Sequence, residues 1–567
     1  MRFRGIVLLC ALIVPAAADE GMWLFDRFPK AQVKEKYGVE VTDEFLDHLR
    51  LSTVRIGGGS GAFVSPNGLI LTNYHVVSEC LSKSAEAGFR CPGLEASVLL
   101  DPHRRYTDLR VVFAPEIGIA YFGGEQDKFT YPRYDFDVAF LRAYENGKPA
   151  ATPQYLKWSA EGAKDTDLVF VAGNPGTTSR LATGAQLAFY RDCQLPLQLS
   201  RLQARITALR EFGGNALISF SNEYKSSAGR LIGLKDQRLM ARKLGFERRL
   251  RKSVENDPKL GEEAAKVWDQ VALAYKNWAP MEKAYEVLEQ PAAQGSTLFR
   301  IARNIVRQQG ESSDGQAQID DRLEIALLGV YLEELKSLGE KDAPLKAILR
   351  GRTPQQAAEA IVKGTGLRDV AARKYAANDP MIQLAQTLEG PAQKIRKRRA
   401  DLIGSLEATS LAKIAEYRSK AIGATEYPDA CFTPRIAFGV VKAYRDKTEA
   451  PVPWATTFGG LYHRAGKEEP YILPQRWVDA KPALDAIVPF NFVSTSDITD
   501  GGPTVNAKGE LVGIVVDGNI ESLPAVYLYS EEQSRTVHMA SQGIVEALRK
   551  VYHVPELLKE LGMPVLQ

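Results

Sequence analysis

Strand-like and helix-like patterns occupy separate blocks of this 567-residue chain. From Thr53 to Gly173, short apolar runs alternate with turn residues, as where Gly61 to Val64 and Leu69 to Thr72 flank the Ser-Pro-Asn-Gly turn at 65–68. An Asn-Gly pair between two such runs is typical of a β-hairpin. Further strand candidates are Leu109 to Ala114, Val138 to Ala143 and Leu168 to Ala172. Their spacing favours an antiparallel sandwich or barrel.

The pattern changes near Thr183, where Ala, Leu, Lys, Glu, Gln and Arg become dominant. Apolar residues then recur at helical spacing, as in Leu199, Leu202, Ile206 and Leu209, which predicts a helical block to about Arg418. Proline cannot donate the backbone hydrogen bond of a helix interior, so each proline within the block is expected at a helix boundary. These prolines are Pro258, Pro280, Pro344, Pro380 and Pro391.

Strand patterns return after Phe432, and the chain closes with a predicted helix at Gln542 to Tyr552. The strand candidates are Phe438 to Tyr444, Phe492-Val493, Leu511 to Val516 and Val526 to Tyr529. A β, helical, β order predicts an α+β fold in which a helical insertion splits one β domain. We therefore expect residues 19–181 and 426–567 to form the β domain, and residues 182–425 to form the helical domain.

The N-terminus has the pattern of a secretory signal peptide over residues 1–18. Arg2 and Arg4 precede an apolar run at 6–14, and small residues at 15–18 form a cleavage site before Asp19. The run is too short to span a bilayer, although an uncleaved anchor helix is the alternative. We expect an exported, periplasmic protein that has no membrane association after cleavage.

The mature chain would contain four cysteines, Cys80, Cys91, Cys193 and Cys431, with no C-x-x-C spacing. An oxidising compartment permits a disulfide between Cys80 and Cys91, which would close a short loop. The alternative is that all four are small buried apolar side chains.

Composition and motifs exclude several classes of function. The chain has 72 Lys and Arg against 69 Asp and Glu, a net charge of +3, so it has no basic field for nucleic acid or an anionic membrane. It contains no H-E-x-x-H, no C-x-x-C and no G-x-x-x-x-G-K-[ST]. We therefore expect no metal and no cofactor.

His75 is the strongest candidate for a general base among the six histidines. It follows the 61–72 hairpin, so the imidazole would stand at the end of a strand, as the catalytic base does in trypsin-like double barrels. Asp137 begins the Asp-Val-Ala-Phe run at 137–140, a position suited to an acid that orients the imidazole. The alternatives are a structural histidine and a strand-capping aspartate that faces solvent.

Five segments of the chain form a specific set of motifs: Ala18 to Trp23, Leu71 to His75, Phe122-Gly123-Gly124 leading to Pro132-Arg133, Gly173 to Gly176, and Asp517-Gly518-Asn519. Together they resemble the exported bacterial serine dipeptidyl aminopeptidases of the dipeptidyl-peptidase 7 and 11 family. The resemblance covers nearly the whole mature chain. It implies a trypsin-like double β-barrel with a large helical cap domain, usually a homodimer, which removes dipeptides from oligopeptides with a free N-terminus.

The sequence departs from the family pattern at the nucleophile. Family members read roughly D-I-T-G-G-N-S-G-S-P, whereas this chain reads Asp-Ile-Thr-Asp-Gly-Gly-Pro at 497–503. In the family, the amine-binding Asp lies seventeen positions after the nucleophile serine. Asp517 matches that Asp and stands seventeen positions after Asp500, so this register puts Asp500 in the serine position. Asp500 can also be read as the residue before a deleted serine. The nearest hydroxyls are those of Thr499, Ser496 and Ser494.

A second departure lies at the substrate-binding positions. Lys128 and Phe129 stand where the family often has Asn-Trp, and a lysine there would repel the substrate's ammonium unless it swings into solvent. Gly518 stands where acidic-specific members have Arg, so the resemblance implies a pocket for apolar side chains. Asp517 remains as the counter-charge.

A third departure is a shortened segment between Leu99-Leu100-Asp101 and Arg105 to Arg110. A helix and a strand of the family are expected to be missing there.

Three functional hypotheses follow from the sequence: a serine dipeptidyl aminopeptidase of doubtful activity, a catalytically dead peptide-binding or scaffold protein of the same fold, and an unrelated helical adaptor with β ends. The last fits the composition but not the motifs.

Overall fold

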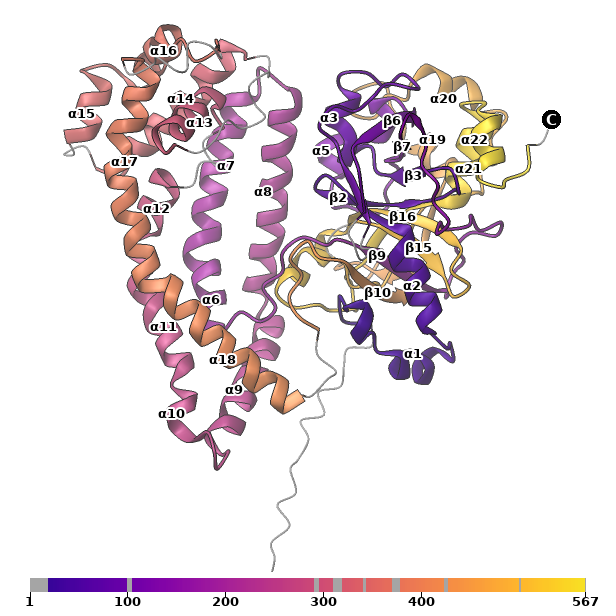
Figure 1. The fold of residues 1–567 in the computed structure, drawn as a ribbon, viewed down its shortest axis with the longest axis horizontal. Coiled ribbons are helices and arrows are strands. Elements are labelled where there is room, and N and C mark those ends of the chain that lie inside the picture. The colour runs from indigo at the N-terminus through magenta and orange to yellow at the C-terminus, as the bar shows by residue number, and fades with distance from the viewer. Residues whose placement is uncertain are drawn as a thin grey trace, which may run out of the picture. The chain divides into compact units, whose positions relative to one another are not determined.

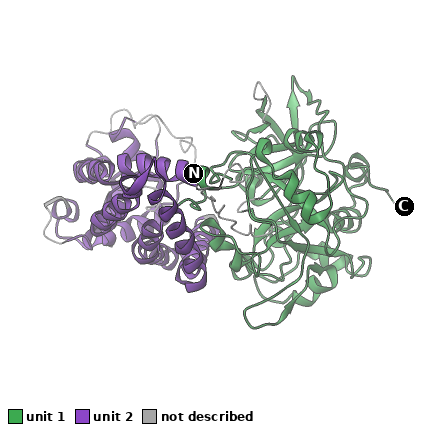
Figure 2. Cartoon of the chain, turned by 90° about the horizontal axis from the view of Figure 1, so that it is seen from below, with its two compact units in different colours: residues 1–181, 419–567 green, residues 182–418 purple. Residues whose placement is uncertain are grey.

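The structure of the protein is a computed structural model that describes residues 19–98, 104–289, 295–308, 319–339, 343–369, 378–422, 427–498 and 501–565. The chain divides into two compact units (Figure 2). One combines the residues up to Leu181 with those from Ser419 onward, and the other is Ala182–Arg418. The leader at 1–18, Leu99 to Asp101, Thr499 and Asp500 lie outside the described residues.

The first sheet of the β unit comes entirely from the N-terminal part of the chain. Its strands are β1 Thr53–Ile56, β2 Gly59–Phe63, β3 Leu69–Thr72, β4 Ala96–Val98, β5 Arg104–Tyr106, β6 Asp108–Phe113, β7 Ala139–Glu145 and β8 Lys148–Pro149. They pair antiparallel in the order β5-β4-β1-β2-β3-β7-β6, and β8 pairs with β7. Only Thr107 separates β5 from β6, so the strand at one edge continues into the strand at the other edge. The sheet therefore curls back on itself as a barrel.

The second sheet combines one strand from before the helical insertion with strands from after it, as the purple ribbon at β9 and the orange to yellow ribbons at β10 and β15 in Figure 1 show. Its strands are β9 Leu168–Gly173, β10 Arg435–Val440, β13 Ala455–Thr457, β14 Pro489–Ser494, β15 Pro503–Asn506, β16 Leu511–Gly518 and β17 Thr536–Ala540. Their order is β10-β9-β15-β16-β17-β14-β13, so β9 lies between two C-terminal strands. A bridge between Val441 and Ser494 joins the end of β10 to β14, and this closes a six-stranded ring.

Two short strands lie apart from these sheets, β11 Tyr444–Arg445 and β12 Pro451–Val452, which pair with each other. The helices of the β unit are α1 Lys30–Tyr37, α2 Asp43–Ser52, α3 Ser78–Leu81, α4 Ile117–Ala120, α5 Gly124–Asp127, α19 Phe458–Arg464, α20 Gln475–Ala480, α21 Ser541–Lys550 and α22 Pro555–Glu560. Helix α21 corresponds to the helix predicted at Gln542 to Tyr552.

The hairpin predicted from Asn67-Gly68 joins β2 to β3. Val64 donates its backbone N–H to the carbonyl of Leu69 at 2.8 Å. Gly68 has φ +70°, and a Cβ there would lie 2.8 Å from the carbonyl oxygen of Ala143. A side chain at this position would be strained both by the backbone and by its neighbour. The turn therefore requires glycine.

One apolar core fills the space between the two sheets and draws on both parts of the sequence. The rings of Phe136 and Trp477 lie 5.5 Å apart at their centroids, and those of Phe136 and Phe490 lie 6.3 Å apart. All three side chains are fully buried. Burial of each ring contributes roughly 2 kcal/mol, so this core holds the N-terminal and C-terminal parts together.

The second unit is helical. Its helices are α6 Gly184–Phe189, α7 Leu195–Leu209, α8 Gly214–Lys235, α9 Gln237–Glu255, α10 Gly261–Ala265, α11 Val267–Trp278, α12 Glu282–Leu288, α13 Thr297–Val306, α14 Asp321–Lys336, α15 Ala343–Leu349, α16 Pro354–Gly364, α17 Pro380–Arg399 and most of α18 Ser405–Ile422. Thr183 caps α6 through a capping box with Gln186, where the change of pattern was predicted.

Two local predictions were wrong. Val526 to Tyr529 is not a strand, because Ile520–Val526 forms a 3-10 helix around Pro524, and Val526 is buried at its end. Pro391 is not a helix boundary but lies inside α17. Buried apolar residues on both sides of Pro391, such as Leu388 and Ala392, anchor α17. This packing offsets the cost of the lost hydrogen bond, about 3 kcal/mol.

Cys80 and Cys91 form a disulfide, so the alternative that all four cysteines are unpaired is wrong. Cys193 and Cys431 are free thiols.

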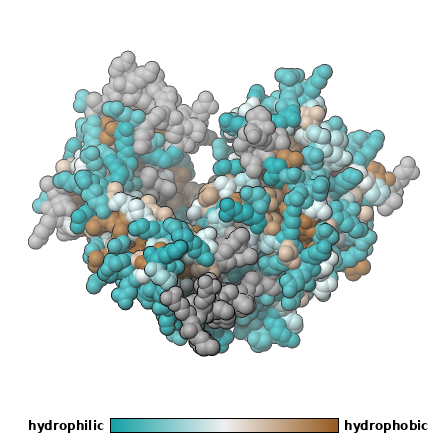
Figure 3. Space-filling view, turned by 60° about the horizontal axis from the view of Figure 1, so that its bottom comes forward, coloured by the Kyte–Doolittle hydropathy of each residue, from teal (hydrophilic) through white to brown (hydrophobic). Residues whose placement is uncertain are grey.

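The face of the molecule in Figure 3 is mainly hydrophilic, with scattered apolar residues. Within the described ranges, no helix combines the length and the apolar character needed to cross a membrane.

A buried polar group lies inside the second barrel. His538 on β17 is fully buried, and its Nε2 lies 2.7 Å from the hydroxyl of Ser494. Its Nδ1 lies 2.9 Å from the hydroxyl of Thr504. Burial disfavours the charged imidazole and lowers the pKa of His538 from 6.5 to about 3.

This lowered pKa predicts loss of stability in acid. Between about pH 6.5 and pH 3 the unfolded chain binds a proton at His538 that the folded chain does not bind. The free energy of unfolding therefore falls as the pH falls, by about 3 kcal/mol at about pH 4 from this group. His538→Gln, which has no titrating ring, should lack this part of the pH dependence in urea unfolding, whereas the exposed control His463→Gln should keep it. An unchanged pH dependence in His538→Gln would contradict the prediction.

Candidate active site

His75 begins a 3-10 helix, His75–Val77, three residues after β3 ends. Its backbone N–H donates to Oδ1 of Asp137 at 3.0 Å, and its ring Nδ1 lies 2.5 Å from Oδ2 of the same carboxylate. The imidazole is 52% exposed, while the Asp137 side chain is 5% exposed. A buried carboxylate thus fixes the orientation of a solvent-accessible imidazole, which is the arrangement of a general base and its orienting acid.

The Asp137 carboxylate is held in its charged form although it is buried. Burial raises its pKa, but the charge of His75 and the two hydrogen bonds from His75 lower it, and Lys128 adds to this effect. The net pKa of Asp137 lies below its ordinary value. An ionised partner on Nδ1 stabilises an imidazole that takes up a proton on its other nitrogen, Nε2.

Asn73 is a buried polar residue at this site that our sequence reasoning did not single out. Its Nδ2 donates to the carbonyl of Asp137 and to the carbonyl of Val515, both at 3.0 Å. Val515 belongs to β16 of the second sheet, so Asn73 connects this sheet to the segment that contains His75. The signal that could have identified Asn73 in the sequence was its position, as a polar residue between a buried strand and His75.

Lys128 and Asp517 form an ion pair in the β unit. Nζ of Lys128 lies 3.5 Å from Oδ2 of Asp517, and their side chains are 15% and 2% exposed. The backbone N–H of Phe129 donates to the same Oδ2 at 3.0 Å, and that of Gly518 donates to Oδ1 at 2.9 Å. The structure thus brings together the four residues that the resemblance placed at the substrate pocket. Lys128 points to Asp517 and not into open solvent.

Gly518 has little space around it. A Cβ at this position would lie 2.2 Å from the hydroxyl of Ser522. A long side chain such as arginine would therefore require Ser522 to move. This crowding is a local reason for glycine in a position where the resemblance has arginine in some members.

A buried ion pair anchors the segment before residue 499. Both guanidinium ends of Arg180 donate to Asp497, with Nη2 to Oδ1 at 2.6 Å, and the two side chains are 4% and 0% exposed. The backbone N–H of Gly21 also donates to Asp497, at 2.8 Å. On the other side of 499–500, the N–H of Val515 donates to the carbonyl of Gly502 at 3.0 Å. Both flanks are therefore fixed to the second barrel.

The hydroxyls of Ser494 and Ser496 are buried and engaged elsewhere. Ser494 contacts His538, and Ser496 lies 3.0 Å from Ser494. Their residues are 0% and 3% exposed. Both hydroxyls are thus engaged within the second barrel, and Thr499 and Asp500 lie outside the described residues.

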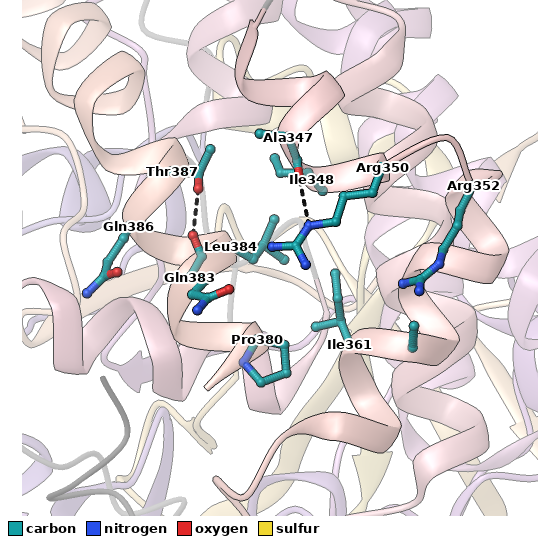
Figure 4. A pocket seen from close by; sticks show the side chains of 11 residues that line it. Ala347, Ile348, Arg350, Arg352, Ile361, Pro380, Gln383, Leu384, Gln386 and Thr387 are labelled. Carbon is teal, nitrogen blue, oxygen red and sulfur yellow. Dashed lines mark hydrogen bonds between the residues drawn. The ribbon is translucent and has the colours of Figure 1, made fainter. Parts of the chain in front are cut away.

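The helical unit contains a hollow of about 290 Å³ (Figure 4). It is lined by Ala347, Ile348, Arg350, Arg352, Ala360, Ile361, Pro380, Gln383, Leu384, Gln386 and Thr387. None of the candidate site residues proposed from the sequence is among them. Across the part of the chain that the structure describes, no group of three or more His, Cys, Asp or Glu residues is placed to hold a metal ion.

The His75 and Asp137 pair predicts a stability defect that depends on pH. His75→Ala removes the ring hydrogen bond to a buried carboxylate, so the free energy of unfolding at neutral pH should fall by about 1 kcal/mol, a value kept small because the imidazole is half-exposed. Because the folded-state pKa of Asp137 is lowered, this stabilisation is present above about pH 4 and is lost as the pH falls through the folded-state pKa.

Urea unfolding at neutral pH and below about pH 3 measures the effect. The defect of His75→Ala should shrink in acid, and His75→Gln, which can still donate a hydrogen bond, should be less affected. An equal defect at both pH values would show that the pair does not hold Asp137 ionised.

Solved structures of other proteins share this fold. A crystal structure of Porphyromonas endodontalis DPP11 in complex with substrate superposes with a TM-score of 0.83 at 18% identity and covers 96% of this chain and 100% of that chain. A second structure of that protein, in complex with the dipeptide Arg-Glu, gives the same score. The predicted α+β fold class, a double β-barrel interrupted by a helical region, is therefore confirmed.

Curated relatives cover almost the whole chain. The Asp/Glu-specific dipeptidyl-peptidase of Shewanella putrefaciens is 26% identical over 734 residues, which covers 98% of this chain and 99% of the relative. Dipeptidyl-peptidase 7 of Phocaeicola vulgatus is 21% identical over 733 residues, with 98% of each covered. Both alignments are longer than this 567-residue chain, so the chain lacks segments that the relatives contain.

The family model described as Peptidase S46 matches residues 18–88 and 96–563. The match includes the segments that carry His75, Asp137 and Asp517. It also spans the helical insertion, so it applies to both compact units. The chain belongs to the peptidase S46 family.

Proposed function

We propose that this protein binds oligopeptides in a site of the dipeptidyl-peptidase type and hydrolyses them only weakly. The observation that carries the proposal is the His75 and Asp137 pair, an oriented and accessible imidazole in a chain of the peptidase S46 family. In this proposal His75 is the general base, and Asp137 fixes its tautomer. The relatives named as dipeptidyl-peptidases support peptides as the ligands.

Weak hydrolysis follows from the sequence at the nucleophile position. Asp500 stands where the family pattern has serine, and a carboxylate that attacks an amide would have to form an anhydride while expelling a poor leaving group. It would also add negative charge where the oxyanion develops. A catalytically dead peptide-binding or scaffold protein is therefore the second candidate. The ion pair between Lys128 and Asp517 favours this candidate, because Lys128 occupies the carboxylate that is expected to bind the substrate amine.

The pocket for the penultimate side chain is proposed to accept apolar groups. Gly518 supplies no positive charge, and Ser522 fills the space in which a longer side chain would stand. An acidic side chain would therefore meet no cation from this position. The homodimer rests on the resemblance alone and stays a prediction.

Activity measurements test the nucleophile assignment. The unmodified chain should cleave dipeptidyl dye substrates at no more than the residual level of triad mutants, roughly 10³ to 10⁴ over water. Asp500→Ser alone should restore little, because the missing Gly-Asn segment would also shape the oxyanion donors, each of which contributes about 3 kcal/mol. Insertion of Gly-Gly-Asn together with Ser should raise kcat by a larger factor.

The matched control is the same insertion with Ala in place of Ser, which should be inactive. Full turnover by the unmodified chain, with a serine-reactive phosphonate attached to Thr499 or Ser496, would contradict the assignment of Asp500. If no version cleaves the substrates and none binds peptides, the proposed function itself is rejected.

Export is a separate proposal. We propose that residues 1–18 direct the chain to the periplasm and are removed before Asp19, as their sequence pattern indicates. Expression of the full chain in a Gram-negative host should yield periplasmic protein whose N-terminal sequence starts Asp-Glu-Gly-Met-Trp. Protein that retains Met1 to Ala18 in the membrane fraction would instead support the anchor alternative.

A further inference from the structure

We propose that Lys128 makes the site selective for peptides whose N-terminus is acylated and uncharged, and that its ammonium donates a hydrogen bond to the acyl carbonyl oxygen. The inference rests on the proposed function in one respect, namely that peptides bind beside His75. It concerns which peptide end the site accepts and is independent of whether hydrolysis occurs.

The first step is that the Asp517 carboxylate already has its partners within the chain. It accepts backbone N–H groups from Phe129 and Gly518 and pairs with the Lys128 ammonium. Its side chain is only 2% exposed. A ligand ammonium could reach this carboxylate only by displacing Lys128, so Asp517 is poorly available to a free N-terminus.

The second step is the balance of charge around the site. Two acidic side chains around Lys128 have cationic partners, Asp517 with Lys128 and Asp135 with Arg133 at 2.9 Å. Arg133 and Asp135 are buried, so bulk water does not screen them well. An additional ammonium from a free N-terminus would therefore stand beside the Lys128 cation, whose carboxylate partner Asp517 is already paired.

The third step is that Lys128 is held in place with donor capacity to spare. Its Nζ lies 5.2 Å from the centroid of the Phe129 ring, and Phe129 has φ +55°, a conformation uncommon for a residue other than glycine. This backbone geometry directs the Phe129 N–H to Asp517 and keeps the ring under the ammonium. An ammonium has three N–H donors, and Asp517 is the carboxylate with which it pairs.

The fourth step places this donor beside the His75 and Asp137 pair. The charge of Lys128 is close enough to contribute to the lowered pKa of Asp137. The Lys128 side chain is 15% exposed, so a ligand can reach it. A carbonyl oxygen is a neutral acceptor that satisfies an ammonium donor without adding charge, and an N-acyl group supplies that oxygen at the end of a peptide.

Peptide binding tests the inference without requiring turnover. Two tetrapeptides of sequence Ala-Leu-Ala-Ala with the same C-terminal fluorophore, one N-acetylated and one with a free N-terminus, are titrated with the mature chain and followed by fluorescence anisotropy. We expect the acetylated peptide to bind at least tenfold more tightly. Lys128→Asn should reduce or reverse this preference, whereas Lys508→Asn, which removes the same charge at the exposed turn between β15 and β16, should retain it.

The outcomes separate the two proposals. Equal or tighter binding of the free peptide by the unmodified chain overturns the selectivity and leaves peptide binding intact. A preference that survives in both Lys128→Asn and the longer variant Lys128→Gln overturns the role of Lys128, provided that circular dichroism shows both variants folded. Binding of neither peptide to any version rejects the proposed function and the selectivity together.

Discussion

Strand β9 is the constraint on which the β unit depends. It comes from the N-terminal part of the chain and lies between β10 and β15, which come from the C-terminal part. Both of its edges are hydrogen-bonded, through Phe170 to Phe438 on one side and to Val505 on the other. The second barrel can therefore close only when the two parts of the sequence meet. In the sequence, the helical insertion lies between β9 and β10, so it lengthens the connection between these two strands and interrupts neither sheet.

The site is built where residues from both sheets converge. His75 and Asp137 come from the first barrel, whereas Asp517 lies at the end of β16 in the second. Asn73 connects them by donating to the carbonyls of Asp137 and Val515. Because these contacts are short and largely buried, the geometry of the imidazole is coupled to the packing of the barrels.

This chain departs from its family both by lacking segments that the relatives contain and at positions that the resemblance assigns to the substrate, while the double-barrel fold is retained. The second barrel is intact on both flanks of residues 499–500, and the Arg180 pair with Asp497 anchors one of these flanks. In contrast, Lys128 places a cation on the carboxylate that the resemblance assigns to the substrate amine.

Local sequence determined the elements whose signals are contained in a few neighbouring residues. The Asn67-Gly68 hairpin, β9, β16, α7 and the cap at Thr183 follow from turn chemistry and periodicity. Short strands such as β1 and β15 were missed, and Val526 to Tyr529 was predicted wrongly, because a few apolar residues fit a strand or a buried 3-10 helix equally well. The sequence suggested His75 with Asp137, and the resemblance suggested Asp517. Only the tertiary structure decided that Lys128 pairs with Asp517 and that the backbone N–H of Phe129 donates to Asp517, which lies 388 positions away. The reason is that loop conformation and charge balance arise from contacts that no local sequence pattern encodes.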